Sequence, residues 1–151
     1  MITVEAVPYD DPVAAVLRAD LLADLTGRYG GDGDSTPITP GEFDPPRGGF
    51  LLAWLDGRPA GCVGWRSRGD GVAELKRMWV ALDARRRGVA KALLTAVEDA
   101  ARSAGRNRIV LETGTAQPEA MGLYAASGYA LVPNYGHYAD SPLSRSYARD
   151  L

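Results

Sequence analysis

The chain has 151 residues, of which 46% are hydrophobic and 24% charged, values typical of a globular protein with a single domain over residues 1–151. Its formal net charge of −2 argues against a general nucleic-acid-binding protein, because affinity for a polyphosphate chain depends on an excess of Lys and Arg. No run approaches the roughly 18 apolar residues of a membrane span, and the first residues lack a secretory signal. We therefore expect a cytoplasmic protein that does not contact membranes.

The first third of the chain predicts a strand, a helix and a long loop. Apolar and polar residues alternate over residues 2–6, as in a half-buried strand. Asp11 and Pro12 form the N-cap and the first position of a helix that ends before Gly30. Residues 30–48 are rich in Gly, Asp, Pro and Thr and predict a loop, either mobile or acting as a lid over a substrate. The apolar stripe of the helix comprises Val13, Val16, Leu17, Leu21 and Leu25.

An antiparallel meander of three strands follows. Residues 49–55 and 59–68 flank an Asp-Gly turn, which is a hairpin signature, and a further turn leads into a strand over residues 72–82. The single cysteine, Cys62, lies in the second strand with no histidine near it in sequence. We interpret Cys62 as a core residue rather than a nucleophile.

The segment after the meander predicts an amphipathic helix that begins near residue 87 or 88 and ends at Gly105. Its apolar residues have the spacing of a stripe that packs on a sheet, and its charged residues are expected on the opposite face. The stripe comprises Val89, Leu93, Ala96, Val97 and Ala100, and the charged face comprises Lys91, Glu98, Asp99 and Arg102.

The turn before this helix is unusually cationic. Arg85, Arg86 and Arg87 crowd a helix N-terminus, where the macrodipole and the unpaired N–H groups already make the potential positive. Gly88 and the small Ala90 leave the backbone bare, so a phosphate could approach those N–H groups. The turn predicts an anion site, and a solvated basic turn is the alternative.

The last third predicts another strand, a short helix and two final strands. Residues 108–113 form an apolar strand, so the preceding helix is a crossover that favours parallel pairing with the strand over residues 72–82. Residues 118–127 form a short helix, and strands over 130–133 and 144–148 are joined by an aromatic loop. That loop holds His137, the only histidine, as an acceptor-site residue or an incidental one.

The predicted fold class is therefore α/β: a mixed, mostly antiparallel sheet with a central parallel pair and helices on both faces. A strand over residues 108–113 that splays from its parallel partner would expose sheet edges. Exposed edges of this kind would allow a homodimer.

Three stretches, in their order and spacing, resemble the GNAT (Gcn5-related) N-acetyltransferases over nearly the full chain. Residues 85–90, RRRGVA, resemble the family's Arg/Gln-x-x-Gly-x-Gly/Ala loop, with Ala90 where Gly is commoner. The strand over 74–80 precedes this loop at the family's spacing. The stretch from residue 111 to 129 matches the second half of the acetyl-CoA site, with Gln117 where the family usually has Asn.

The resemblance implies a fold that binds acetyl-CoA as cosubstrate without a metal. Backbone amides of the arginine loop would hold the pyrophosphate. The main-chain N–H groups of Met78 and Val80, beside a local bulge, would hold the pantetheine and polarise the thioester oxygen. The implied cofactor-binding residues are Met78, Val80, Arg85, Arg86, Arg87, Gly88, Val89, Ala90, Lys91 and Gln117.

The implied reaction is transfer of the acetyl group to a primary amine of a small molecule or peptide by direct attack in a ternary complex. An alkylamine with a pKa of about 10.4 is mostly protonated at pH 7, so a base assists. Glu74 stands where some family members carry the catalytic glutamate, acting directly or through water; pairing with Lys76 or Arg77 is the alternative. Tyr124 is the implied acid for the leaving thiolate, and aromatic packing is its alternative role.

Two questions stay open at this point. The alternative function is a non-catalytic acyl-CoA-binding regulatory domain, which would have no reason to keep both Glu74 and Tyr124. The acceptor is not identified, because the acidic residues of the 30–48 segment suit either a cationic acceptor or a solvated loop. These residues are Asp32, Asp34, Glu42 and Asp44.

Overall fold

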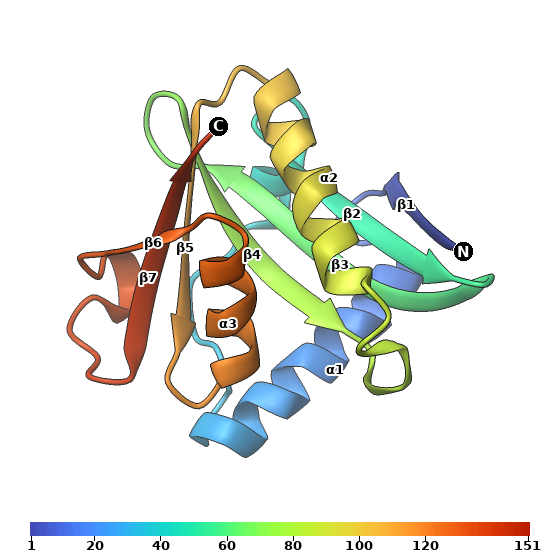
Figure 1. Ribbon diagram of the computed structural model, residues 1–151, viewed down its shortest axis with the longest axis horizontal. Helices are drawn as coiled ribbons and strands as arrows, with labels where there is room; N and C mark the ends of the chain where they lie inside the picture. Colours follow the sequence, from blue (N-terminus) through green and yellow to red (C-terminus); the bar gives the residue numbers. More distant parts are fainter.

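A seven-stranded sheet in the order β1-β2-β3-β4-β5-β7-β6 forms the centre of the computed structural model, which describes residues 1–151 (Figure 1). Only β4 and β5 pair in parallel; the other neighbours are antiparallel, which confirms the predicted fold class. None of the helices combines the length and the hydropathy needed to cross a membrane. The elements are β1 (Ile2–Ala6), α1 (Pro12–Tyr29), β2 (Gly48–Leu55), β3 (Arg58–Ser67), β4 (Val72–Val80), α2 (Val89–Ser103), β5 (Arg108–Gly114), α3 (Pro118–Ala126), β6 (Ala130–Val132) and β7 (Ser144–Asp150).

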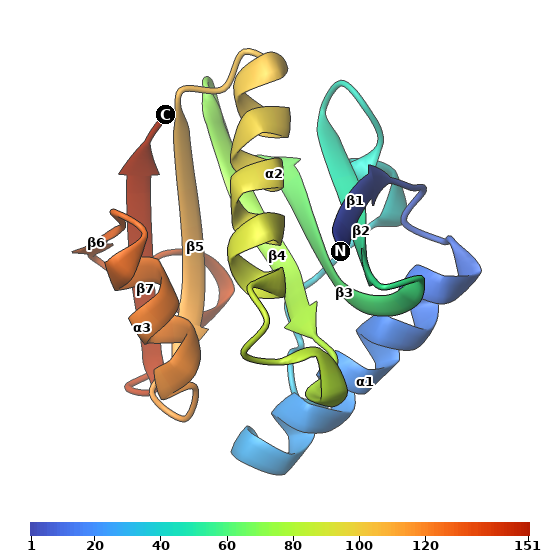
Figure 2. The ribbon, with the colours of Figure 1, turned by 45° about the vertical axis from the view of Figure 1, so that its right-hand side comes forward.

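Helices cover both faces of the sheet, α2 and α3 on one and α1 on the other (Figure 2). The N-cap prediction is confirmed, because the Asp11 carboxylate accepts hydrogen bonds from the N–H groups of Val13 and Ala14 at 3.0 Å. Val16 was wrongly placed in the α1 stripe and is 61% exposed, whereas Ala14 is buried. Ala14 rather than Val16 belongs to the buried stripe, which packs against Phe50 and Trp79 on the face of the sheet opposite α2.

The predicted polar face of α2 contains one buried carboxylate. Glu98 is 7% exposed and accepts hydrogen bonds from the Tyr129 hydroxyl at 2.8 Å and from Arg149 Nη1 at 2.9 Å. Its placement on the solvent side was wrong, because β7 and the segment before β6 supply polar partners there. The spacing of apolar residues predicts which face of α2 packs on the sheet. It does not predict that Tyr129 and Arg149 bury a carboxylate on another face.

Two irregularities shape the middle of the sheet. Arg77 has φ of +57°, and the β3–β4 register shifts between Cys62 and Gly64, so β4 carries a bulge at Arg77. β4 also ends at Val80, two residues earlier than predicted. Its pairing with β5 covers only residues 72–74, after which the two strands separate (Figure 1).

Residues 30–48 form a packed segment that includes a short 3-10 helix, Pro40–Phe43. Phe43 is 2% exposed and its ring stacks on Tyr9 with centroids 4.8 Å apart. Thr36 is also buried. The segment therefore forms part of the wall of the molecule beside β3 and β4, where the composition had predicted only a loop.

Candidate active site

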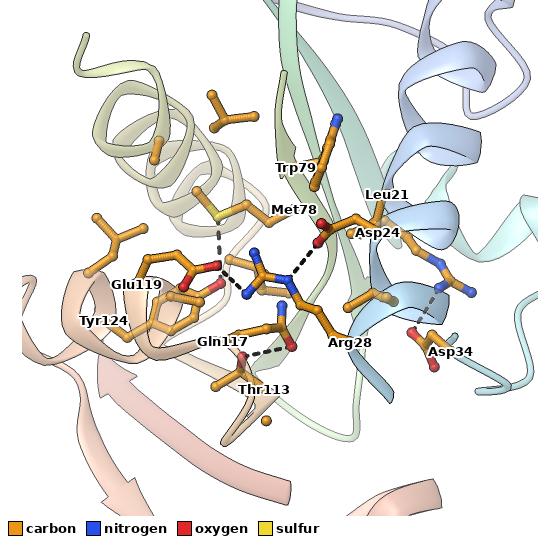
Figure 3. A pocket seen from close by; sticks show the side chains of 18 of the residues that line it. Leu21, Asp24, Arg28, Asp34, Met78, Trp79, Thr113, Gln117, Glu119 and Tyr124 are labelled. Carbon is orange, nitrogen blue, oxygen red and sulfur yellow. Dashed lines mark hydrogen bonds and ion pairs between the residues drawn. The ribbon is translucent and has the colours of Figure 1, made fainter. Parts of the chain in front are cut away.

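A cleft of about 810 Å³ opens where β4 and β5 separate. Its walls come from the second half of β4, the turn before α2, the start of α3 and the C-terminal half of α1 (Figure 3). Such a volume is in the range of small-molecule and cofactor sites. Two of the predicted site residues, Glu74 and Arg87, do not line the cleft. The predicted residues that do line it are Met78, Val80, Arg85, Arg86, Gly88, Val89, Ala90, Lys91, Gln117 and Tyr124.

One end of the cleft is the N-terminus of α2. Gly88 caps the helix with φ of +86° and no side-chain hydrogen bond, and the first turn of the helix contains no acidic residue. A Cβ at Gly88 would meet nothing closer than 3.8 Å, so the approach to the backbone is open. Unpaired N–H groups and the positive end of the dipole therefore face a part of the cleft that Arg86 also lines, as at phosphate sites on helix N-termini. The residues present fit a pyrophosphate.

The middle of the cleft is the unpaired edge of β4. Beyond Glu74 the strand has no β5 partner, so the backbone groups on that edge of residues 75–80 are open to a ligand. Two buried polar atoms of the cleft wall, Trp79 Nε1 and Ser144 Oγ, have no hydrogen-bond partner in the protein. Unpartnered backbone and side-chain groups of this kind fit a ligand with amide groups, such as a pantetheine arm.

Tyr124 reaches across the cleft from α3 towards β4. Its hydroxyl donates a hydrogen bond to Met78 Sδ at 3.6 Å, as Figure 3 shows. The residue is 5% exposed, and burial raises the pKa of its hydroxyl well above the ordinary value. The hydroxyl therefore remains protonated at neutral pH and can act as a donor.

A bridge from α1 to α3 closes another side of the cleft. Arg28 donates hydrogen bonds to Asp24 at 2.9 Å and to the Ala116 carbonyl at 2.8 Å, and it also pairs with Glu119 (Figure 3). The Tyr29 hydroxyl donates to Gln117 Oε1 at 3.1 Å. The amide of Gln117 is therefore oriented from α1, a helix nearly 90 residues away in sequence.

Glu74 lies outside this cleft, in an ion pair. Its Oε1 is 2.7 Å from Arg66 Nε, and its side chain is only 3% exposed. The expected alternative, pairing with Lys76 or Arg77, is wrong, because Arg66 stands directly opposite Glu74 in the β3–β4 register. Glu74 lines a second cavity of about 450 Å³ instead.

A buried charge cluster lies where the strands separate. Asp34 Oδ2 is 2.8 Å from Arg77 Nη1 and 3.9 Å from Lys76 Nζ. Lys76 Nζ is 3.7 Å from Glu112 Oε1, while Glu112 Oε2 is buried without a partner. Burial raises the pKa of Glu112 above its ordinary value, although the nearby Lys76 ammonium acts in the opposite direction.

Residues 17–129 match the profile of the acetyltransferase (GNAT) family. The chain belongs to the GNAT family. It is 38% identical over 97 residues to an IAA acetyltransferase of Azospirillum brasilense, in a match that covers 63% of each chain. The chain thus spans less than two thirds of that relative's length.

Two solved structures resemble this GNAT chain over almost its full length. A Klebsiella pneumoniae protein assigned as an acyl-CoA N-acyltransferase is 26% identical and has a TM-score of 0.83. The match covers 100% of this chain and 98% of that one. A GNAT acetyltransferase of Elizabethkingia anophelis with acetyl-CoA bound is 16% identical with a TM-score of 0.71, over 99% of this chain and 98% of that one. The second likeness shows the fold alone.

The cleft is lined by residues that lie far apart in the sequence. One of them, Glu112, was not assigned a role from the sequence. Glu112 lies in a stretch that was matched only to the acetyl-CoA site. A carboxylate directly after the apolar run Ile109–Leu111 was the available signal for a functional role. His137 lines the second cavity. The structure contains no group of three or more His, Cys, Asp or Glu side chains that could hold a metal ion.

Proposed function

We propose that this chain is an N-acetyltransferase that transfers the acetyl group of acetyl-CoA to a primary amine of a small molecule or peptide by direct attack. The observation that carries the proposal is the cleft between β4 and β5, which ends at the uncapped N-terminus of α2. Membership of the GNAT family supports it, as does the acetyl-CoA bound by the Elizabethkingia protein of the same fold. The cytoplasmic location and the homodimer stay predictions.

We assign a different role to each part of the cleft along its length. Backbone N–H groups of residues 85–90 would hold the pyrophosphate, and those of Met78 and Val80 would hold the pantetheine and stabilise charge developing on the thioester oxygen. Tyr124 would protonate the leaving sulfur. Glu74 as the base stays a prediction, but its ion pair with Arg66 argues against it, because proton uptake would break that pair.

The first test is isothermal titration of acetyl-CoA into the wild type and into an Arg86→Glu, Gly88→Glu double variant. We expect the variant to lose at least about tenfold in affinity, because it places two carboxylates beside the phosphates and loses a cation. The matched control is Arg47→Glu, Gly105→Glu: Arg47 is exposed and Gly105 has φ of +82° with open space around it. This control makes the same charge change and imposes a similar backbone strain away from the cleft.

Wild-type binding that the site variant loses and the control retains would support the cofactor site. Release of free CoA in the presence of amines then separates an enzyme from a non-catalytic acyl-CoA-binding domain. A well-folded wild type that does not bind acetyl-CoA would refute the proposed function.

A further inference from the structure

We propose that the second cavity is the acceptor site, that it takes a small amine bearing an anionic group, and that Glu112 is the general base. This inference rests on the proposed function. It identifies the acceptor class and the proton-accepting residue, neither of which the family match provides.

The second cavity has the size and lining of a site for a charged small molecule. Its volume is about 450 Å³, and none of its ten lining residues is hydrophobic. Ordinary ligand pockets are mostly apolar, so a lining without hydrophobic residues indicates a ligand that is itself charged or strongly polar. The charged or titratable residues of the lining are Glu42, Arg66, Arg68, Glu74, Glu112 and His137.

Glu112 is the one residue that lines both this cavity and the large cleft. It lies two residues beyond Val110, the last β5 residue paired with β4, at the apex of the opening between the strands. Its side chain is 7% exposed, and its Oε2 has no partner. A buried carboxylate oxygen without a donor is unfavourable, and an ammonium group entering from the second cavity would supply that donor.

Arg68 provides the complementary charge. Its guanidinium lies over the Tyr135 ring, 4.3 Å from the centroid, and it forms no ion pair. Arg66, the other arginine of the cavity, is neutralised by Glu42 at 3.0 Å and by Glu74 at 2.7 Å. The cavity therefore presents a cation without an ion pair, Arg68, and a buried carboxylate oxygen without a partner, Glu112 Oε2. This combination suits a molecule carrying both an ammonium and a carboxylate or phosphate.

The ammonium group of the acceptor loses two protons during the reaction. Glu112 removes one proton from the ammonium, which leaves a neutral amine beside the thioester carbon. As the C–N bond forms and the C–S bond breaks, the Tyr124 hydroxyl delivers its proton to the departing sulfur, and the second proton of the amine replaces it on the Tyr124 oxygen. The products are the amide and CoA thiol, and the proton on Glu112 returns to water.

The surroundings of Glu112 suit a base that works near neutral pH. Lys76 and Glu74 face it from β4, Asp34 from the 30–48 segment, and Tyr135 from the loop before β7. Burial and the two neighbouring carboxylates raise the pKa of Glu112, while Lys76 lowers it. The rate should therefore fall on the acid side with an apparent pKa above that of an ordinary glutamate.

The test compares Glu112→Gln with Glu74→Gln, an isosteric change in the neighbouring buried carboxylate. The probes are the L-amino acids and phosphoethanolamine, each paired with the amine that lacks the anionic group. We expect Glu112→Gln to retain acetyl-CoA binding, to lose about 10²- to 10⁴-fold in kcat and to lose the acid limb of the pH profile. Glu74→Gln should retain that limb at a lower pH, because the Glu74 charge is one of those that raise the pKa of Glu112.

Arg68→Gln tests the anion-binding half of the proposal. We expect the KM for the anionic amine to rise about tenfold or more, and the KM for the matched amine without the anionic group to change much less. If acetyl-CoA is bound but no anionic amine is acetylated, or if Glu112→Gln keeps the acid limb, the acceptor proposal is wrong. Loss of acetyl-CoA binding by the wild type would instead refute the proposed function.

Discussion

The thiol of Cys62 is fully buried in the core. The side chain has 0% exposure, its Sγ donates a hydrogen bond to the Arg77 carbonyl at 3.4 Å, and burial raises the pKa of the thiol to about 12. The interpretation of Cys62 as a core residue is thereby confirmed.

Because thiolate is the reactive form, we expect no alkylation of Cys62 by iodoacetamide at pH 8 while the protein is folded. The same reagent should modify it completely in urea, which serves as the control. Mass spectrometry of the intact chain measures both. Rapid modification of the folded protein would show that the segment around the Arg77 bulge opens readily.

Two glutamates of the central strands show how neighbours decide the role of a residue. Glu74 and Glu112 both follow apolar strand residues, and sequence reasoning singled out Glu74 as the base. The β3–β4 register places Arg66 opposite Glu74, whereas Glu112 lies beyond the last paired residues of β4 and β5. Glu74 is therefore neutralised by Arg66 at 2.7 Å, whereas Glu112 pairs with Lys76 only at 3.7 Å, through Oε1, and its Oε2 has no partner.

At the scale of a single element, α2 is attached through Glu98 to β7 and to the segment before β6. Its carboxylate joins the Tyr129 hydroxyl and Arg149 of β7, all partly or fully buried. This contact adds a polar link to the apolar stripe of the helix. It also aligns α2, and with it the uncapped helix N-terminus at the cleft.

We expect Glu98→Ala to lower the free energy of unfolding by about 2–4 kcal/mol, because the buried Tyr129 hydroxyl and Arg149 lose a charged partner. Asp99→Ala is the matched control, since that carboxylate is exposed and pairs only with the nearby Arg102. Its effect should stay below about 1 kcal/mol. Urea denaturation measures both, and equal effects would contradict the role of Glu98.

For the molecule as a whole, the 30–48 segment is joined to β4 and to the loop before β7 through Asp34. Its carboxylate accepts hydrogen bonds from the Thr36 hydroxyl at 2.6 Å, Arg77 at 2.8 Å and the Tyr138 hydroxyl at 3.1 Å. Burial alone would raise the pKa of Asp34, but Lys76, Thr36 and Arg77 together lower it below its ordinary value of 3.8.

Because the pKa of Asp34 is lower in the folded than in the unfolded chain, the ionised carboxylate stabilises the fold above about pH 3.8. This stabilisation is lost as the pH falls through the pKa of Asp34 in the folded protein. We therefore expect Asp34→Asn to lower the free energy of unfolding by about 1–3 kcal/mol at neutral pH, with a difference from wild type that narrows in acid. Asp32→Asn, at an exposed position in the same segment, is the control. Urea denaturation at several pH values measures the effect, and a difference independent of pH would contradict this role.

Local patterns along the chain were sufficient to predict the order and type of the elements, the parallel crossover and the arginine turn at the start of α2. Periodicity, caps and glycines act over a few residues, so their signal lies within each stretch. The partners of Glu74, Glu98 and Glu112 depend instead on strand register and on segments distant in the chain. The bulge at Arg77 and the packing of residues 30–48 also depend on strand register and on distant segments. Only the folded chain brings these segments together.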